Sequence, residues 1–263
     1  MISFNNLGNY GRLGNTMFQY AALKGIAAHR GFDFCLSPLL AQSELTSTFN
    51  IPSHHVEFST HTTIQEDLHH FNQQFFDTCP DNVDLLGYFQ TEKYFKHIEQ
   101  LIRNDFTFHE TISTQCQTTI TNIRNTEMID MGDVCSTEII AMHIRRGDYV
   151  TLQDYHPVLP IEYYTEALTK MPYTHVLVFS DDIEWCQQYF KGSRFFFSKS
   201  NTSAVDLCLM SMCDYHIIAN SSFSWWGAWL AKSKQVIAPA QWFGPALSDK
   251  NTSDVYCDGW IKL

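Results

Sequence analysis

The chain has little positive charge. Of its 263 residues, 17 are lysine or arginine and 28 are aspartate or glutamate, so the formal net charge is −11 at pH 7. A protein that binds nucleic acid or an anionic membrane over a broad surface needs a basic face, which this composition does not supply. We therefore expect no nucleic-acid partner. A small anion remains compatible with the composition, because two or three positive groups are enough to hold one phosphate.

Long apolar runs and metal-type cysteine spacings are also missing. No apolar run reaches the ~20 residues needed to cross a bilayer, and residues 1–10 lack the charged and apolar regions of a signal peptide. The eight cysteines form no Cys-x-x-Cys pair, which argues against a zinc site and favours buried, reduced thiols. With 44% hydrophobic residues, the chain can bury a sizeable core, and we predict a cytoplasmic protein without a transmembrane segment.

The C-terminal half alternates between two kinds of segment. Helical stretches begin near Pro160, at Ile183, at Ala204 and at Ser222, and each follows a short β-rich run. The predicted strands are residues 139–144, 175–180, 194–198, 215–219 and 235–238. This alternation with short connections is typical of a parallel, Rossmann-like sheet, so we predict the α/β class.

The N-terminal half is less regular. We predict a helix that Asn15 caps and that runs to about His29, with Gly31 at its end, followed by a strand over 32–36. A second helix is predicted to start at Thr91, whereas residues 42–84 are polar and weakly periodic. We place the domain boundary near residue 130, which gives an N-terminal domain over 1–130 and a C-terminal domain over 131–263.

Polar clusters follow three of the predicted strands. The first is His143, Arg145, Arg146 and Asp148, the second Asp181 and Asp182, and the third Ser221, Ser222 and Phe223. Carboxyl ends of parallel strands meet at one edge of the sheet, where open α/β proteins bind ligands. Paired arginines there indicate an anion, most simply a phosphate. The two aspartates can cap a helix, bind Mg²⁺ or Mn²⁺, or accept hydrogen bonds from a nucleoside.

Five motifs together resemble the α-1,2-fucosyltransferases of glycosyltransferase family 11. In chain order they are GRLGNTMFQYA (11–21), GYFQTEKYF (87–95), HIRRGDY (143–149), VFSDD (178–182) and DLCLMSMCDYHIIANSSFSWWGAWLA (206–231). The resemblance implies a GT-B architecture, that is, two facing Rossmann-like domains, with the C-terminal parallel sheet binding the nucleotide and the N-terminal domain on the acceptor side. It also implies an inverting, metal-independent enzyme that moves L-fucose from GDP-fucose to a galactose-containing acceptor. Such an enzyme can lie at the periphery of the membrane where its glycan acceptors are assembled.

The resemblance also implies roles for single residues. Arg145 would hold the diphosphate of the donor, His143 would lie beside the guanosine, and Asp181 or Asp182 would read the guanine. Ser221, Ser222 and Phe223 would form the loop over the phosphates, and Asn15 would face the transfer site. Neither a cofactor nor a metal ion is expected.

Several alternatives stay open at this point. Asp148 and His143 are both candidates for the base that takes the acceptor proton, and Asp148 can equally orient the arginines. A metal-dependent transferase that uses Asp181 and Asp182 is a second hypothesis, and an α-1,3 linkage is a variant of the first. A non-catalytic nucleotide-binding or sugar-binding protein is a third, which leaves the paired arginines without a role.

Overall fold

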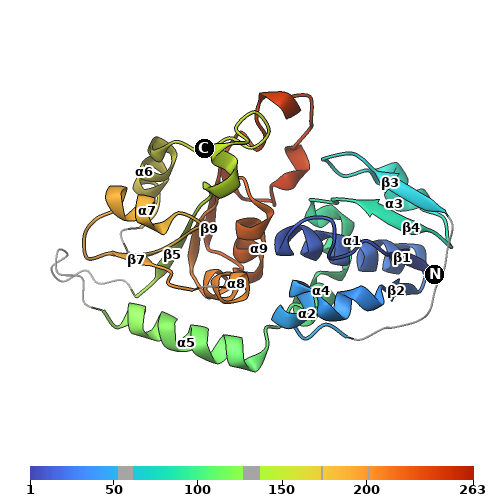
Figure 1. The fold of residues 1–263 in the computed structure, drawn as a ribbon, viewed down its shortest axis with the longest axis horizontal. Helices are drawn as coiled ribbons and strands as arrows, with labels where there is room; N and C mark the ends of the chain where they lie inside the picture. The colour runs from blue at the N-terminus through green and yellow to red at the C-terminus, as the bar shows by residue number, and fades with distance from the viewer. Residues whose placement is uncertain (53–61, 127–136, 173, 201) are drawn as a thin grey trace. The chain divides into compact units, whose positions relative to one another are not determined.

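The computed structural model describes residues 1–52, 62–126, 137–172, 174–200 and 202–263. The chain divides into two compact units (Figure 1): unit 1 is Met1–His109 with Lys250–Cys257, and unit 2 is Glu110–Asp249 with Asp258–Leu263. The domain boundary predicted near residue 130 lies outside the described residues. Helix α5 (Glu110–Arg124), which precedes it, belongs to unit 2.

Unit 1 contains a parallel sheet in the order β2-β1-β4-β3. Its strands are β1 (Ile2–Phe4), β2 (Phe34–Leu36), β3 (Thr63–Glu66) and β4 (Asp84–Gly87). Only β2 was predicted. The polar Ser3 can occupy a buried strand because its hydroxyl donates a 2.8 Å hydrogen bond to Oδ1 of Asp84.

The central helix of unit 1 is α1 (Leu13–Arg30), most of whose residues are buried. The prediction that Asn15 caps it is wrong, since the N-cap residue is Arg12, which makes no side-chain capping bond. The predicted end at Gly31 is confirmed: this glycine has φ +68°, and its N–H bonds the carbonyls of Ala27 and Ala28.

The helix predicted from Thr91 is interrupted. Thr91 does cap a helical turn, because its hydroxyl accepts a hydrogen bond from the N–H of Lys93, but the turn η2 (Glu92–Tyr94) stops at Phe95. Phe95 has φ −135° and ψ 4°, outside the helical region. A second turn, η3 (Lys96–Ile98), then leads into α4 (Glu99–Asp105). The other helical segments of unit 1 are η1 (Pro38–Gln42), α2 (Glu44–Thr48), α3 (Gln73–Thr78) and η6 (Ser253–Val255).

Unit 2 contains the second parallel sheet, in the order β10-β9-β8-β5-β6-β7. Its strands are β5 (Ile139–Ile144), β6 (His175–Ser180), β7 (Phe195–Phe197), β8 (Tyr215–Ile217), β9 (Gln235–Ala238) and β10 (Ile261–Lys262). The five strands predicted in this half are confirmed, with ends that differ by up to two residues. The short strand β10 was not predicted.

Unit 2 begins with α5, which was not predicted, and its helices after β5 are close to their predicted positions. They are α6 (Ile161–Thr169), α7 (Ile183–Tyr189), α8 (Ser203–Ser211) and α9 (Ser222–Ala231), with the turns η4 (Gly147–Val150) and η5 (Pro245–Leu247). Trp225, Trp226 and Trp229 of α9 are buried, as expected for residues that pack the helix in the core. The cysteines that the structure describes are free thiols, all buried except the partly exposed Cys257.

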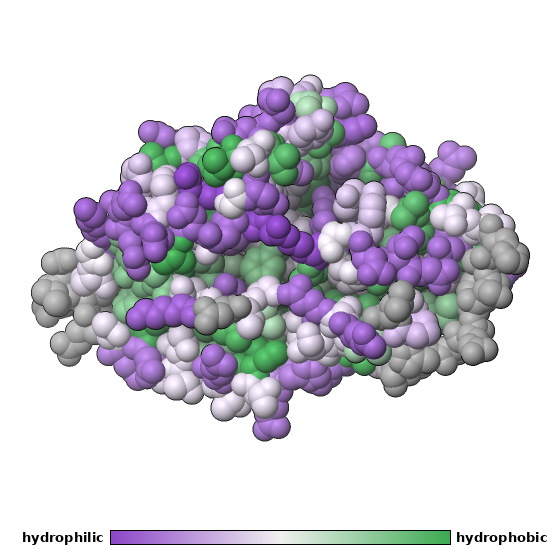
Figure 2. All heavy atoms as spheres, viewed as in Figure 1, coloured by the Kyte–Doolittle hydropathy of each residue, from purple (hydrophilic) through white to green (hydrophobic). Residues whose placement is uncertain are grey.

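No helix among the described residues is long and apolar enough to cross a membrane. Hydrophilic side chains cover much of the face drawn in Figure 2.

Candidate functional site

The predicted anion site lies in unit 2, where β5 ends. All six residues of β5 are buried, and the chain leaves the sheet at Arg145, whose side chain is 16% exposed. The neighbouring strands β6 and β8 run parallel to β5, so Asp181 and Ser221 leave the sheet at the same edge. Three segments that lie far apart in the sequence therefore meet there.

Arg145 forms ion pairs with two carboxylates. Its Nη2 atom lies 2.5 Å from Oδ1 of Asp148, and its Nη1 atom lies 2.8 Å from Oδ2 of Asp181. The guanidinium carbon also lies 5.2 Å from the centroid of the Tyr149 ring. Contacts on three sides fix the direction of the guanidinium before any ligand arrives.

Arg146 is held separately. Its Nε atom donates a 3.0 Å hydrogen bond to Oδ2 of Asp182, and its backbone N–H donates to Oδ1 of Asp181 at 2.9 Å. Its guanidinium carbon lies 4.2 Å from the centroid of the Trp185 ring, a cation–π contact. Of the two aspartates predicted as possible caps of α7, Asp182 is the one that caps it, since its Oδ1 atom accepts a hydrogen bond from the N–H of Trp185.

His143 lies behind the arginines and is only 7% exposed. Burial, and to a lesser degree the charge of Arg145, lower the pKa of His143 to about 3, so the imidazole is neutral at pH 7. Its ring centroid is 5.8 Å from that of Phe223. The structure thus places the His143 ring beside the first turn of α9.

The loop before α9 combines a helix cap with a link to the arginine segment. The Ser221 hydroxyl caps α9 by accepting a 3.3 Å hydrogen bond from the N–H of Phe223. The carbonyl of Asn220 accepts a 3.1 Å hydrogen bond from the Tyr149 hydroxyl. The partial positive charge at the start of α9, with Ser222 as its first residue, suits a phosphate.

Asn15 belongs to unit 1, whereas the arginine cluster belongs to unit 2. Its Oδ1 atom accepts a 2.8 Å hydrogen bond from Nε2 of Gln90. Gly11 has φ +106°, and a Cβ there would meet Nδ2 of Asn15 at 2.5 Å. The glycine is therefore needed where the loop passes over the asparagine side chain.

Two contact residues of the cluster were not foreseen. The position of Trp185 near the cluster could have been predicted from the sequence, because Trp185 lies three residues after the helix cap Asp182 and such a residue lies close to the cap. Tyr149 closes the motif HIRRGDY, but only the fold shows that its ring contacts Arg145 and its hydroxyl reaches Asn220.

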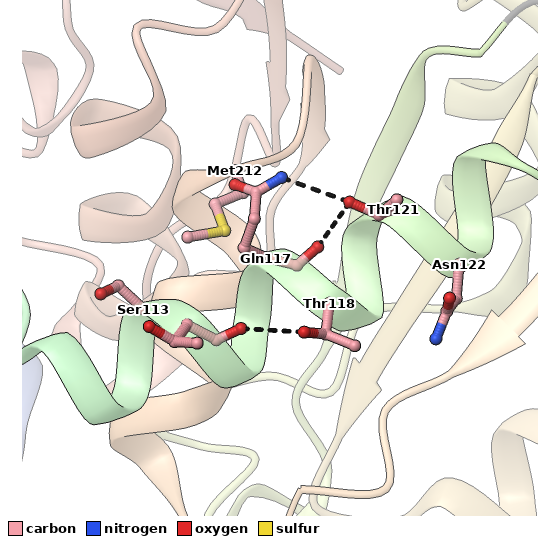
Figure 3. A pocket seen from close by; sticks show the side chains of 7 residues that line it. Ser113, Gln117, Thr118, Thr121, Asn122 and Met212 are labelled. Atoms are coloured by element: carbon pink, nitrogen blue, oxygen red, sulfur yellow. Dashed lines mark hydrogen bonds between the residues drawn. The ribbon is translucent and has the colours of Figure 1, made fainter.

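The carboxylates of the cluster are engaged with arginines and with a helix terminus. Over the described ranges, no group of three or more His, Cys, Asp or Glu side chains is arranged to hold a metal ion. A hollow away from these residues, drawn in Figure 3, lies on α5 and is lined by Ser113, Thr114, Gln117, Thr118, Thr121, Asn122 and Met212. None of these side chains is charged and none is a predicted site residue, so this hollow offers a diphosphate no positive side chain.

Solved structures define the fold. The fucosyltransferase NodZ from Bradyrhizobium covers 89% of this chain, and 94% of its own, with a TM-score of 0.55 at 12% identity. A NodZ α-1,6-fucosyltransferase structure soaked with GDP-fucose aligns with a TM-score of 0.53, also at 12% identity, over 89% of this chain and 93% of its own. The predicted α/β GT-B class is confirmed by this likeness and by the parallel sheet of each unit.

The chain belongs to glycosyl transferase family 11, whose sequence model matches residues 2–263. An Escherichia coli α-1,2-colitosyltransferase is 36% identical over 198 residues, which are 69% of this chain and 63% of that protein. The Escherichia coli O-antigen biosynthesis glycosyltransferase WbnK is 39% identical over 136 residues, covering 47% of this chain and 44% of WbnK. The galactoside α-(1,2)-fucosyltransferase 1 of Saimiri boliviensis boliviensis is 26% identical over 84% of this chain and 63% of its own length. The chain thus spans less than two thirds of the length of these curated relatives.

Proposed function

We propose that the chain transfers L-fucose from GDP-fucose to the 2-hydroxyl of a galactoside, with inversion at C1 and without a metal ion. The observation that carries this proposal is Arg145, held at the carboxyl end of β5 by Asp148 and Asp181. Family membership supports glycosyl transfer, and the α-(1,2)-fucosyltransferase relatives support the sugar and the linkage.

The donor diphosphate would bind at Arg145. A guanidinium has five N–H donors, and its two ion pairs engage only part of them, so donors remain for phosphate oxygens. As the bond from C1 to the β-phosphate breaks, negative charge grows on that phosphate. A guanidinium that is already oriented stabilises this charge more in the transition state than in the ground state.

The remaining predicted donor-binding residues of unit 2 lie at or after the ends of β5, β6 and β8. His143 would border the guanosine as a neutral imidazole, and Asp181 or Asp182 would accept from the guanine. Ser221, Ser222 and Phe223, at the start of α9, would offer hydroxyl and backbone donors to the phosphates. Asn15 would act from unit 1.

In the reaction, the acceptor O2 forms the new bond to C1, GDP leaves with the bonding electrons, and the acceptor proton passes to a base. A pKa of about 3 makes His143 a weak base at pH 7, so we assign it only to binding. The carboxylate of Asp148 contacts Arg145, and we assign it to orienting that arginine.

A second candidate donor is an activated colitose, favoured by the 36% identity to the α-1,2-colitosyltransferase. Both candidates use the same arginine clamp. They differ in the sugar that C1 belongs to, so a direct comparison of the two donors decides between them.

The experiment is to incubate the protein with GDP-fucose or an activated colitose and a panel of β-galactosides in excess EDTA, and to determine the product linkage by NMR. We expect an α-1,2-fucoside. Loss of all activity in EDTA would favour the metal-dependent hypothesis, and an α-1,3 product would correct the linkage. Arg145→Ala should lower kcat by about 10²–10³. Arg103→Ala, which removes an arginine paired with Glu99 on α4, is the matched control.

A further inference from the structure

Two tyrosines form an aromatic surface on unit 1. The rings of Tyr10 and Tyr88 are stacked, with centroids 4.7 Å apart and planes inclined by 24°. Tyr10 is 37% exposed, and Tyr88 is half-buried. Burial and the neighbouring Tyr10 hydroxyl raise the pKa of Tyr88, which agrees with hydroxyl groups that lie together. The two rings follow β1 and β4, strands that pair side by side.

Buried contacts hold this tyrosine pair in place. Gln19 of α1 is fully buried, and its Nε2 atom donates to the carbonyls of Tyr10, at 2.9 Å, and Gly87, at 3.2 Å. One amide therefore ties both loops together. Phe89 has φ +54°, an uncommon conformation for a phenylalanine, and its ring is buried 5.2 Å from that of Tyr94. The flanking residues Tyr88 and Gln90 are both less buried than Phe89.

A polar group accompanies the rings. The amide of Gln90 donates one N–H to Oδ1 of Asn15 at 2.8 Å, which fixes its orientation. An amide has two donors and a carbonyl oxygen that accepts two hydrogen bonds, so this bond uses one of its four positions. Apolar ring faces combined with a few oriented polar groups are typical of small-molecule sites.

We propose that Tyr10, Tyr88 and Gln90 form the subsite for the galactose ring of the acceptor. One face of galactose presents several C–H groups, which can pack on an exposed tyrosine ring, while its hydroxyls suit an oriented amide. This inference rests on the proposed function for the identity of the ligand. The site is composed entirely of residues of unit 1.

The test uses lactose as the acceptor and compares Tyr10→Ala, Tyr10→Phe and Gln90→Leu with the unaltered protein. Tyr10→Ala and Gln90→Leu should raise the KM for lactose about tenfold, the effect of a single aromatic or hydrogen-bond contact. In Tyr10→Ala, the KM for GDP-fucose and its slow transfer to water should not change. Gln90 also bonds Asn15, so the lactose KM is the only readout for Gln90→Leu. Tyr10→Phe keeps the ring and should stay within about twofold of the unaltered enzyme. Leu101→Ala, an exposed position on α4, is the control.

A lactose KM that is unchanged in Tyr10→Ala overturns the subsite, as does a parallel loss of transfer to water, which indicates a structural role. Saturation-transfer NMR of lactose in the presence of GDP gives a readout that needs no turnover. Binding that depends on Tyr10 in a protein without transferase activity would keep the subsite and overturn the proposed function. If the protein is an active fucosyltransferase but does not bind lactose, the proposed function stands and the subsite is overturned.

Discussion

The carboxylate of Asp181 lies directly against the backbone of Gly147. A Cβ added at residue 147 would stand 2.3 Å from Oδ2 of Asp181, the same oxygen that pairs with Arg145. The glycine in HIRRGDY therefore makes room for the carboxylate that orients the arginine.

Gly147→Ala should displace Asp181 and release Arg145 from one of its two carboxylates. We expect GDP to bind about tenfold more weakly and the free energy of unfolding to fall by about 1–3 kcal/mol. Isothermal titration with GDP and chemical denaturation measure the two effects. Gly192→Ala is the control for GDP binding, because Gly192 also belongs to unit 2 and has no atom within 4 Å of an added Cβ. Its φ of +107° should cost about 1 kcal/mol of unfolding free energy from backbone strain alone, with no change in GDP affinity. Normal GDP affinity in Gly147→Ala would contradict the proposed role of the Asp181–Arg145 pair.

Asp148→Asn distinguishes an orienting carboxylate from a catalytic base. If Asp148 only orients Arg145, the amide keeps a hydrogen-bond acceptor at the same place, and kcat should fall by about tenfold or less. The acidic limb of the pH–kcat profile should not move. A loss of about 10³ or more, together with loss of that limb, would identify Asp148 as the base.

Glu66 should make stability depend on pH. Its carboxyl is 4% exposed, and burial raises its pKa from 4.5 to about 7. Between these values the folded chain keeps a proton that the unfolded chain has released, so the contribution of Glu66 to stability is present below about pH 4.5 and is lost as the pH rises to about 7. Glu66→Gln cannot ionise and should be more stable than the unaltered protein by about 1–3 kcal/mol at pH 8.

Urea denaturation of both proteins at several pH values checks the Glu66 prediction. Glu162→Gln replaces an exposed glutamate of α6 and serves as the control. A difference in unfolding free energy that did not grow between pH 4.5 and 7 would show that Glu66 ionises normally.

Gly25→Ala tests the packing of α1. A Cβ on Gly25 would meet the carbonyl oxygen of Tyr94 at 2.0 Å, a contact with backbone that cannot rotate away. We expect the free energy of unfolding to fall by about 3 kcal/mol or more. Gly31→Ala, at the end of the same helix, meets no atom within 4 Å but keeps φ +68°, so about 1 kcal/mol is expected from strain alone. Equal losses in the two variants would argue against the close approach.

The extent of successful prediction follows from the length and environment of each element. Strands β5 and β6 are six-residue apolar runs buried in the middle of the sheet, and their bounds were predicted to the residue. Strand β10 has two residues, too few for a periodic signal, and β1 carries the polar Ser3 between its apolar residues. The buried hydroxyl of Ser3 is stabilised by its hydrogen bond to Asp84, which lies 81 positions away in the sequence.

The candidate site was also predicted only in part. The residue types at the strand tips could be read from the sequence, because carboxyl ends of parallel strands converge. Their partners could not, since the Arg145–Asp181 pair joins segments 36 positions apart and depends on side-chain direction. The positive φ of Phe89 is likewise set by the packing of its ring and not by local propensity.

The course of the chain limits how the protein can be divided. Unit 1 is completed by Lys250–Cys257, and the residues after that segment return to unit 2, where β10 pairs with β9. Within unit 1, Asp254 pairs with Lys93 and accepts from the backbone N–H of Phe71. A single uninterrupted segment of the gene therefore cannot encode either unit by itself: it omits part of that unit or includes part of the other. An exchange of units between relatives needs to move residues 250–257 together with residues 1–109.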